Sequence, residues 1–253
     1  ALGSVLMAAF GVVGAFLLNA LSYLVSFAAV LLVRADLRPE ASAGGRGYAA
    51  ELREGVAYIF RDRPLRSLLS VFAAFNFFVG PLLILIPMIA QFTLKGSASL
   101  LALLEGFFAL GAAAASIAAS FKKEWDGIYA VFFRSVLFLG LAFGGLYFAG
   151  SRAPVCALLV AAGAALGAGN AAALTLFQRT VPDGMKGRFF AVLTTVCYGV
   201  LPLTFMLNGF LAERFSVGFC IAFNSAGVLS LSCAILMIPR LELPELRQGS
   251  ERL

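Results

Sequence analysis

The sequence predicts an all-α protein that crosses a membrane several times. Hydrophobic residues make up 61% of its 253 residues and charged residues only 13%, a balance outside the range of soluble domains. The charges are far apart, and several uncharged stretches exceed the about 20 residues that a helix needs to cross roughly 30 Å of hydrocarbon. Strand barrels are disfavoured, because barrel strands alternate apolar and polar residues and these stretches are continuously apolar.

The spacing of charged residues defines seven hydrophobic segments. The first, residues 1–33, is too long for one upright helix, and Gly11 and Gly14 predict a break between a stub at 1–10 and a span from about 13 to 33. Two segments contain a charge: 96–121 includes Glu105, and 135–151 extends back toward Gly127 past an interfacial Arg134. We expect a stub and six full transmembrane helices. The other segments are 67–94, 153–178, 189–212 and 215–239.

The basic residues predict an orientation. If the chain crosses alternately, sixteen of its 19 Lys and Arg residues share the side of residues 34–66, and only Lys95, Arg152 and Arg214 lie opposite. Because basic residues gather on the cytoplasmic side, the long loop and the C-terminus are expected in the cytoplasm, at a plasma (bacterial inner) membrane. The net charge of +6 then reflects topology, and nothing in its distribution favours nucleic-acid binding.

The long loop divides the chain into four predicted parts. Within it, residues 39–47 are expected to be flexible, and residues 48–61 to form an amphipathic helix on the membrane surface. No signal peptide is recognisable and the first methionine is Met7, so we expect an N-terminally truncated piece. The predicted parts are the end of an N-terminal bundle at 1–33, a cytoplasmic central loop at 34–66, a helical bundle at 67–240 and a cytoplasmic tail at 241–253.

Residue types argue against enzyme chemistry and against a metal site. Histidine is absent, which removes the commonest general base and the commonest metal ligand. The spans offer no nucleophile with a base and no paired acids, so no enzyme activity is expected. The cysteines lie inside spans without CxxC spacing, which argues against a disulfide framework or a zinc site; they are Cys156, Cys197, Cys220 and Cys233.

Several residues are expected to shape the helices. Pro81, Pro87 and Pro202 each remove a backbone hydrogen bond and can kink their spans. Small residues at helical spacing predict two faces that permit close helix approach, one with Gly163 and Gly167, the other with Gly111, Ala115 and Ala119.

Four passages resemble the C-terminal portion of a major facilitator superfamily transporter, in the drug-efflux and siderophore-export branch of proton antiporters. Residues 1–4 (ALGS) are similar to the end of the antiporter motif of helix five, and residues 16–23 (FLLNALSY) to the opening of helix six. The central loop running into helix seven is matched by residues 51–66 (ELREGVAYIFRDRPLR), and the loop between helices ten and eleven by residues 178–188 (QRTVPDGMKGR). The resemblance implies the end of helix five, helix six and helices seven to twelve. Residues 121–127 (FKKEWDG) depart from the family's gating motif.

Glu105 is the one acid inside a membrane segment, about six residues from the predicted outer end. An ionisable side chain near a helix centre costs roughly 2.5 to 3.5 kcal/mol, so such residues usually face a cavity. Proton coupling or cation binding is one interpretation. The other is a shallow position in contact with water or headgroups.

Two further groups are candidates for transport. Helices seven and ten line or flank the central cavity of the resembled fold, so Asn76 and Asn170 are candidate substrate contacts; interhelical hydrogen bonding is the default for these and for Asn19, Asn208 and Asn224. In the predicted loop 178–188, interdomain salt bridges that close a cytoplasmic gate are one interpretation, with Gly184 and Gly187 allowing a tight turn. Topological anchoring by positive charge is the other. The gate candidates are Asp183, Lys186 and Arg188.

The resemblance implies part of a secondary active transporter that exports small amphipathic molecules by proton antiport with alternating access. Its energy source would be the proton gradient, with no cofactor. Its partners would be the lipid bilayer, a small-molecule substrate and the missing N-terminal helices of the same protein. The alternative is a non-transporting membrane structural or assembly subunit, or an inactive transporter fragment.

Overall fold

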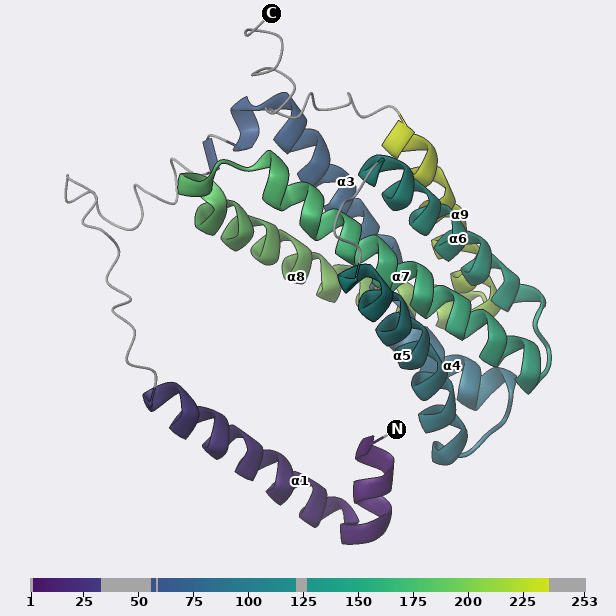
Figure 1. The fold of residues 1–253 in the computed structure, drawn as a ribbon. Helices are drawn as coiled ribbons and strands as arrows, with labels where there is room; N and C mark the ends of the chain where they lie inside the picture. Colours follow the sequence, from purple (N-terminus) through teal and green to yellow (C-terminus); the bar gives the residue numbers. More distant parts are fainter. Residues whose placement is uncertain (1, 33–55, 58, 122–126, 237–253) are drawn as a thin grey trace, which may run out of the picture. The chain divides into compact units, whose positions relative to one another are not determined.

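The computed structural model describes residues 2–32, 56–57, 59–121 and 127–236 (Figure 1). The chain divides into two compact units, Ala1–Glu51 and Leu52–Leu253. Several predictions lie outside the described residues: the flexible segment at 39–47, most of the amphipathic helix at 48–61, the passage at 122–126 and the tail at 241–253.

The first unit contains one long helix with a sharp break. Helix α1 (Leu2–Leu31) is interrupted at Gly11, whose φ of 68° and ψ of 176° lie outside the helical region. Such a positive φ is unfavourable for residues that carry a Cβ, which explains why glycine occupies the break. The predicted division into a stub and a full span is therefore confirmed at Gly11.

The second unit is a bundle of helices. Its described elements are α3 (Arg63–Val79), α4 (Leu82–Met88), α5 (Ala98–Ser120), α6 (Ile128–Phe148), α7 (Arg152–Thr180), α8 (Asp183–Arg214) and α9 (Val217–Leu236), with a π-helical turn at Ile89–Thr93. No strand occurs among the described residues, so the predicted all-α class is confirmed.

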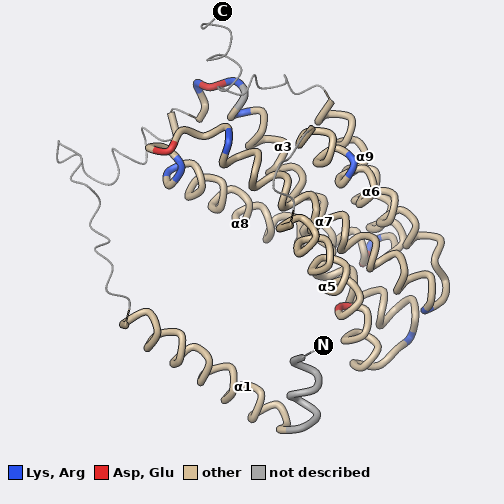
Figure 2. Tube along the Cα trace, in the orientation of Figure 1, with Lys and Arg blue, Asp and Glu red and all other residues tan. Residues whose placement is uncertain are grey.

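Seven helical segments of the described chain are long and apolar enough to span a membrane. The seven are the span after Gly11 and the six spans of the bundle; each was predicted from the sequence, although the predicted total of six full helices is one too few. Most charged residues of the bundle lie near the ends of its helices, and long uncharged stretches lie between them (Figure 2). This arrangement suits a polytopic membrane protein.

The stretch before α3 is helical, as the sequence predicts, but it does not lie on the membrane surface as expected. Among the described residues, 56–57 and 59–61 are helical. Ile59 is fully buried and belongs to the core of the bundle, whereas a position on the membrane surface was predicted. The Asp62 carboxylate then accepts a hydrogen bond from the Leu65 amide at 2.9 Å, which caps the start of α3.

Helices α3 and α4 form one span that is broken at Gly80 and Pro81. Pro81 has no N–H, so the carbonyl of Phe77, four residues earlier, loses its normal helical partner. The hydroxyl of Thr204, on α8, donates to that carbonyl at 2.6 Å. The predicted loss of a helical hydrogen bond at Pro81 is confirmed, and a π-helical turn follows Pro87. Pro202 lies inside α8, which continues past it as one helix.

Helices α5 and α7 pack backbone against backbone. Gly111 faces the Val160 carbonyl, Gly163 faces the Phe108 carbonyl, and a Cβ at either glycine would overlap with the facing backbone. Only glycine allows this approach, which is the basis of small-residue packing in membranes. The predicted packing role of Gly111 and Gly163 is confirmed.

Hydrogen bonds between side chains hold α8 against α9. Asn208 and Asn224 are fully buried, and the Asn224 amide nitrogen donates to the Asn208 amide oxygen at 2.5 Å. The same nitrogen donates to the Cys220 carbonyl, and Asn208 donates to the Thr204 carbonyl. The prediction that asparagines in spans bond between helices is therefore confirmed for this pair.

Candidate transport site

A cavity of about 520 Å³ lies in the bundle and has walls from α3, α4, α5, α7 and α8. Three residues singled out from the sequence line it together: Asn76 from α3, Glu105 from α5 and Asn170 from α7. The rest of the wall is apolar apart from backbone. It consists of Phe75, Val79, Gly80, Leu82, Leu83, Ile86, Phe108, Leu166 and Leu201.

Glu105 projects from the first half of α5. It lies seven residues after Ala98, which is about 10 Å along the axis at 1.5 Å per residue. Its neighbour Leu104 is fully buried, while Glu105 itself is exposed. Within the described part of the chain, Glu105 makes no ion pair. The carboxylate is therefore available to a proton or to a cationic ligand in the cavity.

The two asparagines of the cavity differ in their hydrogen bonds. The Asn76 amide nitrogen donates to the Phe72 carbonyl at 2.9 Å and to the Cys197 sulfur at 3.4 Å. These bonds fix the side chain and leave its amide oxygen, an acceptor, without a partner among the described residues. Asn170 is exposed and has no hydrogen bond within the same residues. Both amides are thus available for polar contacts to a ligand.

Gly80, at the helix break, forms part of the cavity wall. A Cβ at Gly80 would approach the Leu201 side chain and the Asn76 carbonyl, so glycine permits the close contact of α3 with α8. Interrupted helices are typical of transporter binding sites, because they place backbone polar groups in a cavity. Pro81 can be recognised from the sequence, but Thr204, whose hydroxyl donates to the carbonyl that Pro81 leaves free, cannot. The Gly-Pro pair is the sequence signal for this feature.

The three gate candidates lie at the start of α8 and do not line the cavity. Asp183 and Lys186 form an ion pair at 2.5 Å, three residues apart on one helix. The Arg188 guanidinium contacts the Met185 sulfur at 3.7 Å. An acid in a first turn also interacts favourably with the helix dipole. The described contacts of this ion pair are therefore local to α8.

The link between α7 and α8 is shorter than predicted. Only Val181 and Pro182 separate the two helices, although a loop at 178–188 was expected. Gly184 and Gly187 lie inside α8 and neither has a positive φ, so the predicted tight turn at these glycines is wrong. The polar residues of this passage extend the helices instead of forming a loop.

No group of three or more His, Cys, Asp or Glu side chains lies close enough to hold a metal ion among the described residues. Within that part of the chain, the four cysteines are free thiols.

Apolar spanning helices with a cavity among them define a multi-pass membrane protein. A sequence profile of the family described as transmembrane secretion effector, a family of major facilitator transporters, matches residues 1–251. The chain belongs to this family. A comparison with curated proteins finds no match.

Proposed function

We propose that the protein exports small amphipathic molecules in exchange for protons, by alternating access around the cavity. The observation that carries this proposal is the meeting of Glu105, Asn76 and Asn170 in one apolar-walled cavity. Membership of the transporter family supports transport itself. The chemistry of the three side chains supports the choice of coupling ion and of substrate class.

Glu105 is the proposed proton carrier. An ionised side chain within a span is costly, and either protonation or a bound cation removes the uncompensated charge. A proton arriving from outside and a substrate arriving from inside would therefore compete for this carboxylate. Such competition is the simplest way to exchange one for the other, since both cannot neutralise the same charge.

The proposed substrate has an apolar body and few polar groups. Phe75 and Phe108 offer aromatic surface, and the amides of Asn76 and Asn170 offer one or two polar contacts. A mostly apolar cavity with a few convergent polar groups is typical of small-molecule sites. Aromatic rings beside a carboxylate also favour a cation with a flat, apolar frame.

The proposed orientation places the start of α8 in the cytoplasm. The positive-inside rule assigns the side that holds most basic residues to the cytoplasm of the bacterial inner membrane. Asp183, Lys186 and Arg188 would then be cytoplasmic, and Glu105 would lie nearer the outer end of its span. In this orientation the three charged residues are candidates for a cytoplasmic gate.

The test uses full-length protein in inside-out vesicles with an imposed proton gradient and ethidium, a flat aromatic cation, as the probe. We expect Glu105→Gln to abolish gradient-driven ethidium uptake at unchanged protein level. The matched control Glu213→Gln alters an exposed acid near the end of α8 that does not line the cavity, and should transport normally. Full transport by Glu105→Gln would remove this carboxylate from proton coupling.

A second measurement separates coupling from binding. Ethidium exchange without a gradient requires a substrate site but no proton movement. Because the carboxylate also meets the ethidium cation, Glu105→Gln is expected to lower this exchange only in part, while Asn76→Leu with Asn170→Leu is expected to lose it. Normal exchange by the double variant would place the substrate elsewhere.

A further inference from the structure

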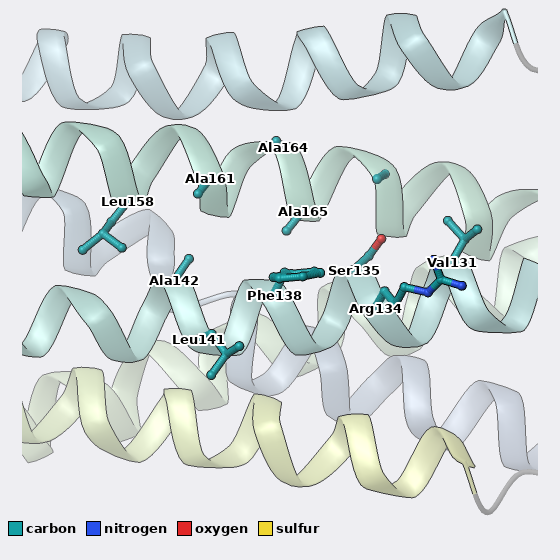
Figure 3. Close-up of a pocket in the computed structure, with 11 residues that line it drawn as sticks. Val131, Arg134, Ser135, Phe138, Leu141, Ala142, Leu158, Ala161, Ala164 and Ala165 are labelled. Atoms are coloured by element: carbon teal, nitrogen blue, oxygen red, sulfur yellow. The ribbon is translucent and has the colours of Figure 1, made fainter.

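A second hollow, of about 580 Å³, lies between α6 and α7 and has a different character (Figure 3). Its α7 side consists of small residues, mainly alanines, and its α6 side carries larger apolar side chains. Only two of its residues have polar side chains, the neighbours Arg134 and Ser135. The apolar lining is Val131, Phe138, Leu141, Ala142, Leu158, Ala161, Ala164, Ala165 and Ala168.

Arg134 brings a permanent positive charge into this groove. It lies six residues after Ile128, about 9 Å along α6 from the start of the helix. Within the described residues it makes no ion pair. A guanidinium inside a span is costly without a partner, and it carries a planar set of donors that matches phosphate. The charge therefore calls for an anionic group at this depth.

Ser135 supplies a second, independent sign of a ligand. The residue is only 7% exposed, yet among the described residues its hydroxyl has no hydrogen bond. Serines in membrane helices normally bond to a backbone carbonyl, as Ser230 does in α9. A nearly buried hydroxyl that lines the same groove as an unpaired guanidinium provides a second donor for one bound oxyanion.

The length of the groove matches one leaflet of a bilayer. From Val131 to Ala142 along α6 is about 16 Å at 1.5 Å per residue, roughly half of the 30 Å hydrocarbon thickness. Figure 3 shows Arg134 and Val131 at one end and Leu158 and Leu141 at the other. A polar end followed by an apolar channel of one-leaflet length fits a single acyl chain, whereas a transmembrane helix would need a groove about twice as long.

We propose that this groove binds an anionic phospholipid, with its phosphate on Arg134 and Ser135 and one acyl chain along the alanines of α7. Basic pockets between transmembrane helices are known to hold acidic headgroups. Among the described residues, no acidic side chain lines the groove to meet the ammonium group of a zwitterionic lipid, so net negative charge is preferred. The site is independent of the proposed transport cycle, since none of its residues lines the cavity of Glu105.

Native mass spectrometry of the full-length protein tests the proposal with dioleoyl phosphatidylglycerol and dioleoyl phosphatidylcholine in matched micelles. We expect wild type to retain phosphatidylglycerol in preference to phosphatidylcholine. Arg134→Gln should weaken phosphatidylglycerol retention about fivefold, the factor that one basic residue contributes near an anionic surface. Arg134→Lys should keep most of the preference. Arg152→Gln, a matched loss of charge outside the groove, should change nothing.

Filling the groove tests the acyl-chain half of the proposal. Ala161→Leu with Ala165→Leu is expected to reduce retention of both lipids, while a monodisperse elution profile confirms folding. Equal binding of the two lipids by wild type, or unchanged binding by Arg134→Gln, would overturn the proposal. So would stabilisation by inorganic phosphate equal to that by phosphatidylglycerol, or a lipid-independent dimer that the double variant abolishes.

Discussion

The bundle has two hollows of similar volume on opposite faces of α7, and a single ionisable group distinguishes each. Leu166 and Asn170 face the cavity, whereas Ala161, Ala165 and Ala168 face the groove, as the 3.6-residue repeat requires. Glu105 gives the cavity a carboxylate, and Arg134 gives the groove a guanidinium. Their volumes are similar, so we expect the sign of this one charge to separate the ligands that the two hollows would take.

The two charges also lie toward opposite ends of the bundle. Glu105 is about 10 Å from the start of α5 and Arg134 about 9 Å from the start of α6. These helices are consecutive and antiparallel, so their starts lie at opposite ends (Figure 1). Each charge therefore lies nearer to one side of the membrane than to the other, and the nearer side differs between the cavity and the groove.

The change expected to disturb both hollows is Gly163→Ala, because α5 and α7 would be forced apart. The new Cβ would overlap with the Phe108 carbonyl. Overpacking of this kind costs about 1 to 3 kcal/mol. Unfolding by detergent titration should show that loss, together with reduced ethidium exchange and reduced lipid retention.

Gly209→Ala is the matched control for this change. Its Cβ would meet nothing within 4 Å, and alanine favours the helix. We expect equal or higher stability for the control. A Gly163→Ala protein as stable as wild type would show that α5 and α7 can separate without cost.

Thr204→Val is expected to lower stability less than Gly163→Ala and to impair only the exchange at the cavity, not lipid binding at the groove. The change keeps the shape of the side chain but removes the donor to the Phe77 carbonyl, which Pro81 leaves without a helical partner. Hydrogen bonds between membrane helices contribute about 0.6 kcal/mol on average and up to about 1.7 kcal/mol. We expect a loss in this range and impaired exchange, with unchanged lipid retention.

Thr195→Val provides the comparison for Thr204→Val. Thr195 is exposed and donates within its own helix to the Ala191 carbonyl at 2.8 Å. Loss of this hydrogen bond removes no contact between helices, so stability and ethidium exchange should stay at wild-type values. Equal effects of the two changes would mean that the Thr204 bond does not hold the helix break.

The smallest effect is expected for Asp183→Asn, which lies in neither hollow. The ion pair with Lys186 is at the surface, where such pairs contribute little and are screened by salt. Thermal unfolding in detergent and lipid retention should both be unchanged. A change in exchange alone, at unchanged stability, would support the proposed gate.

The sequence predicted the spans well because long uncharged stretches and glycine breaks are local properties. The limits of α7 and α8 were missed, since hydropathy reports contact with lipid and cannot show that a helix continues beyond it. Residues 178–188 were interpreted as a loop because they are polar, yet nearly all of them are helical.

The sequence indicated which residues could form the candidate site, but not which residues they and the helix break contact. Acids inside spans are rare enough to single out Glu105. Asn76 and Asn170 were chosen among the asparagines in spans because their segments resemble helices seven and ten. The bond from Thr204 to Phe77 joins residues 127 positions apart, and no local pattern indicates it. Arg134 was interpreted as interfacial, because the sequence does not show that Ser135 and the alanines of α7 complete a groove around it.

The contact between Gly111 and Gly163 has a mechanical consequence. Where side chains interlock, a change of rotamer can absorb a small displacement, but two touching backbones have no such freedom. Helices α5 and α7 therefore form one stiff unit, with Glu105 on one helix and Asn170 on the other. In the proposed mechanism, a displacement of Glu105 on protonation would reach Asn170 without any intermediate side chain.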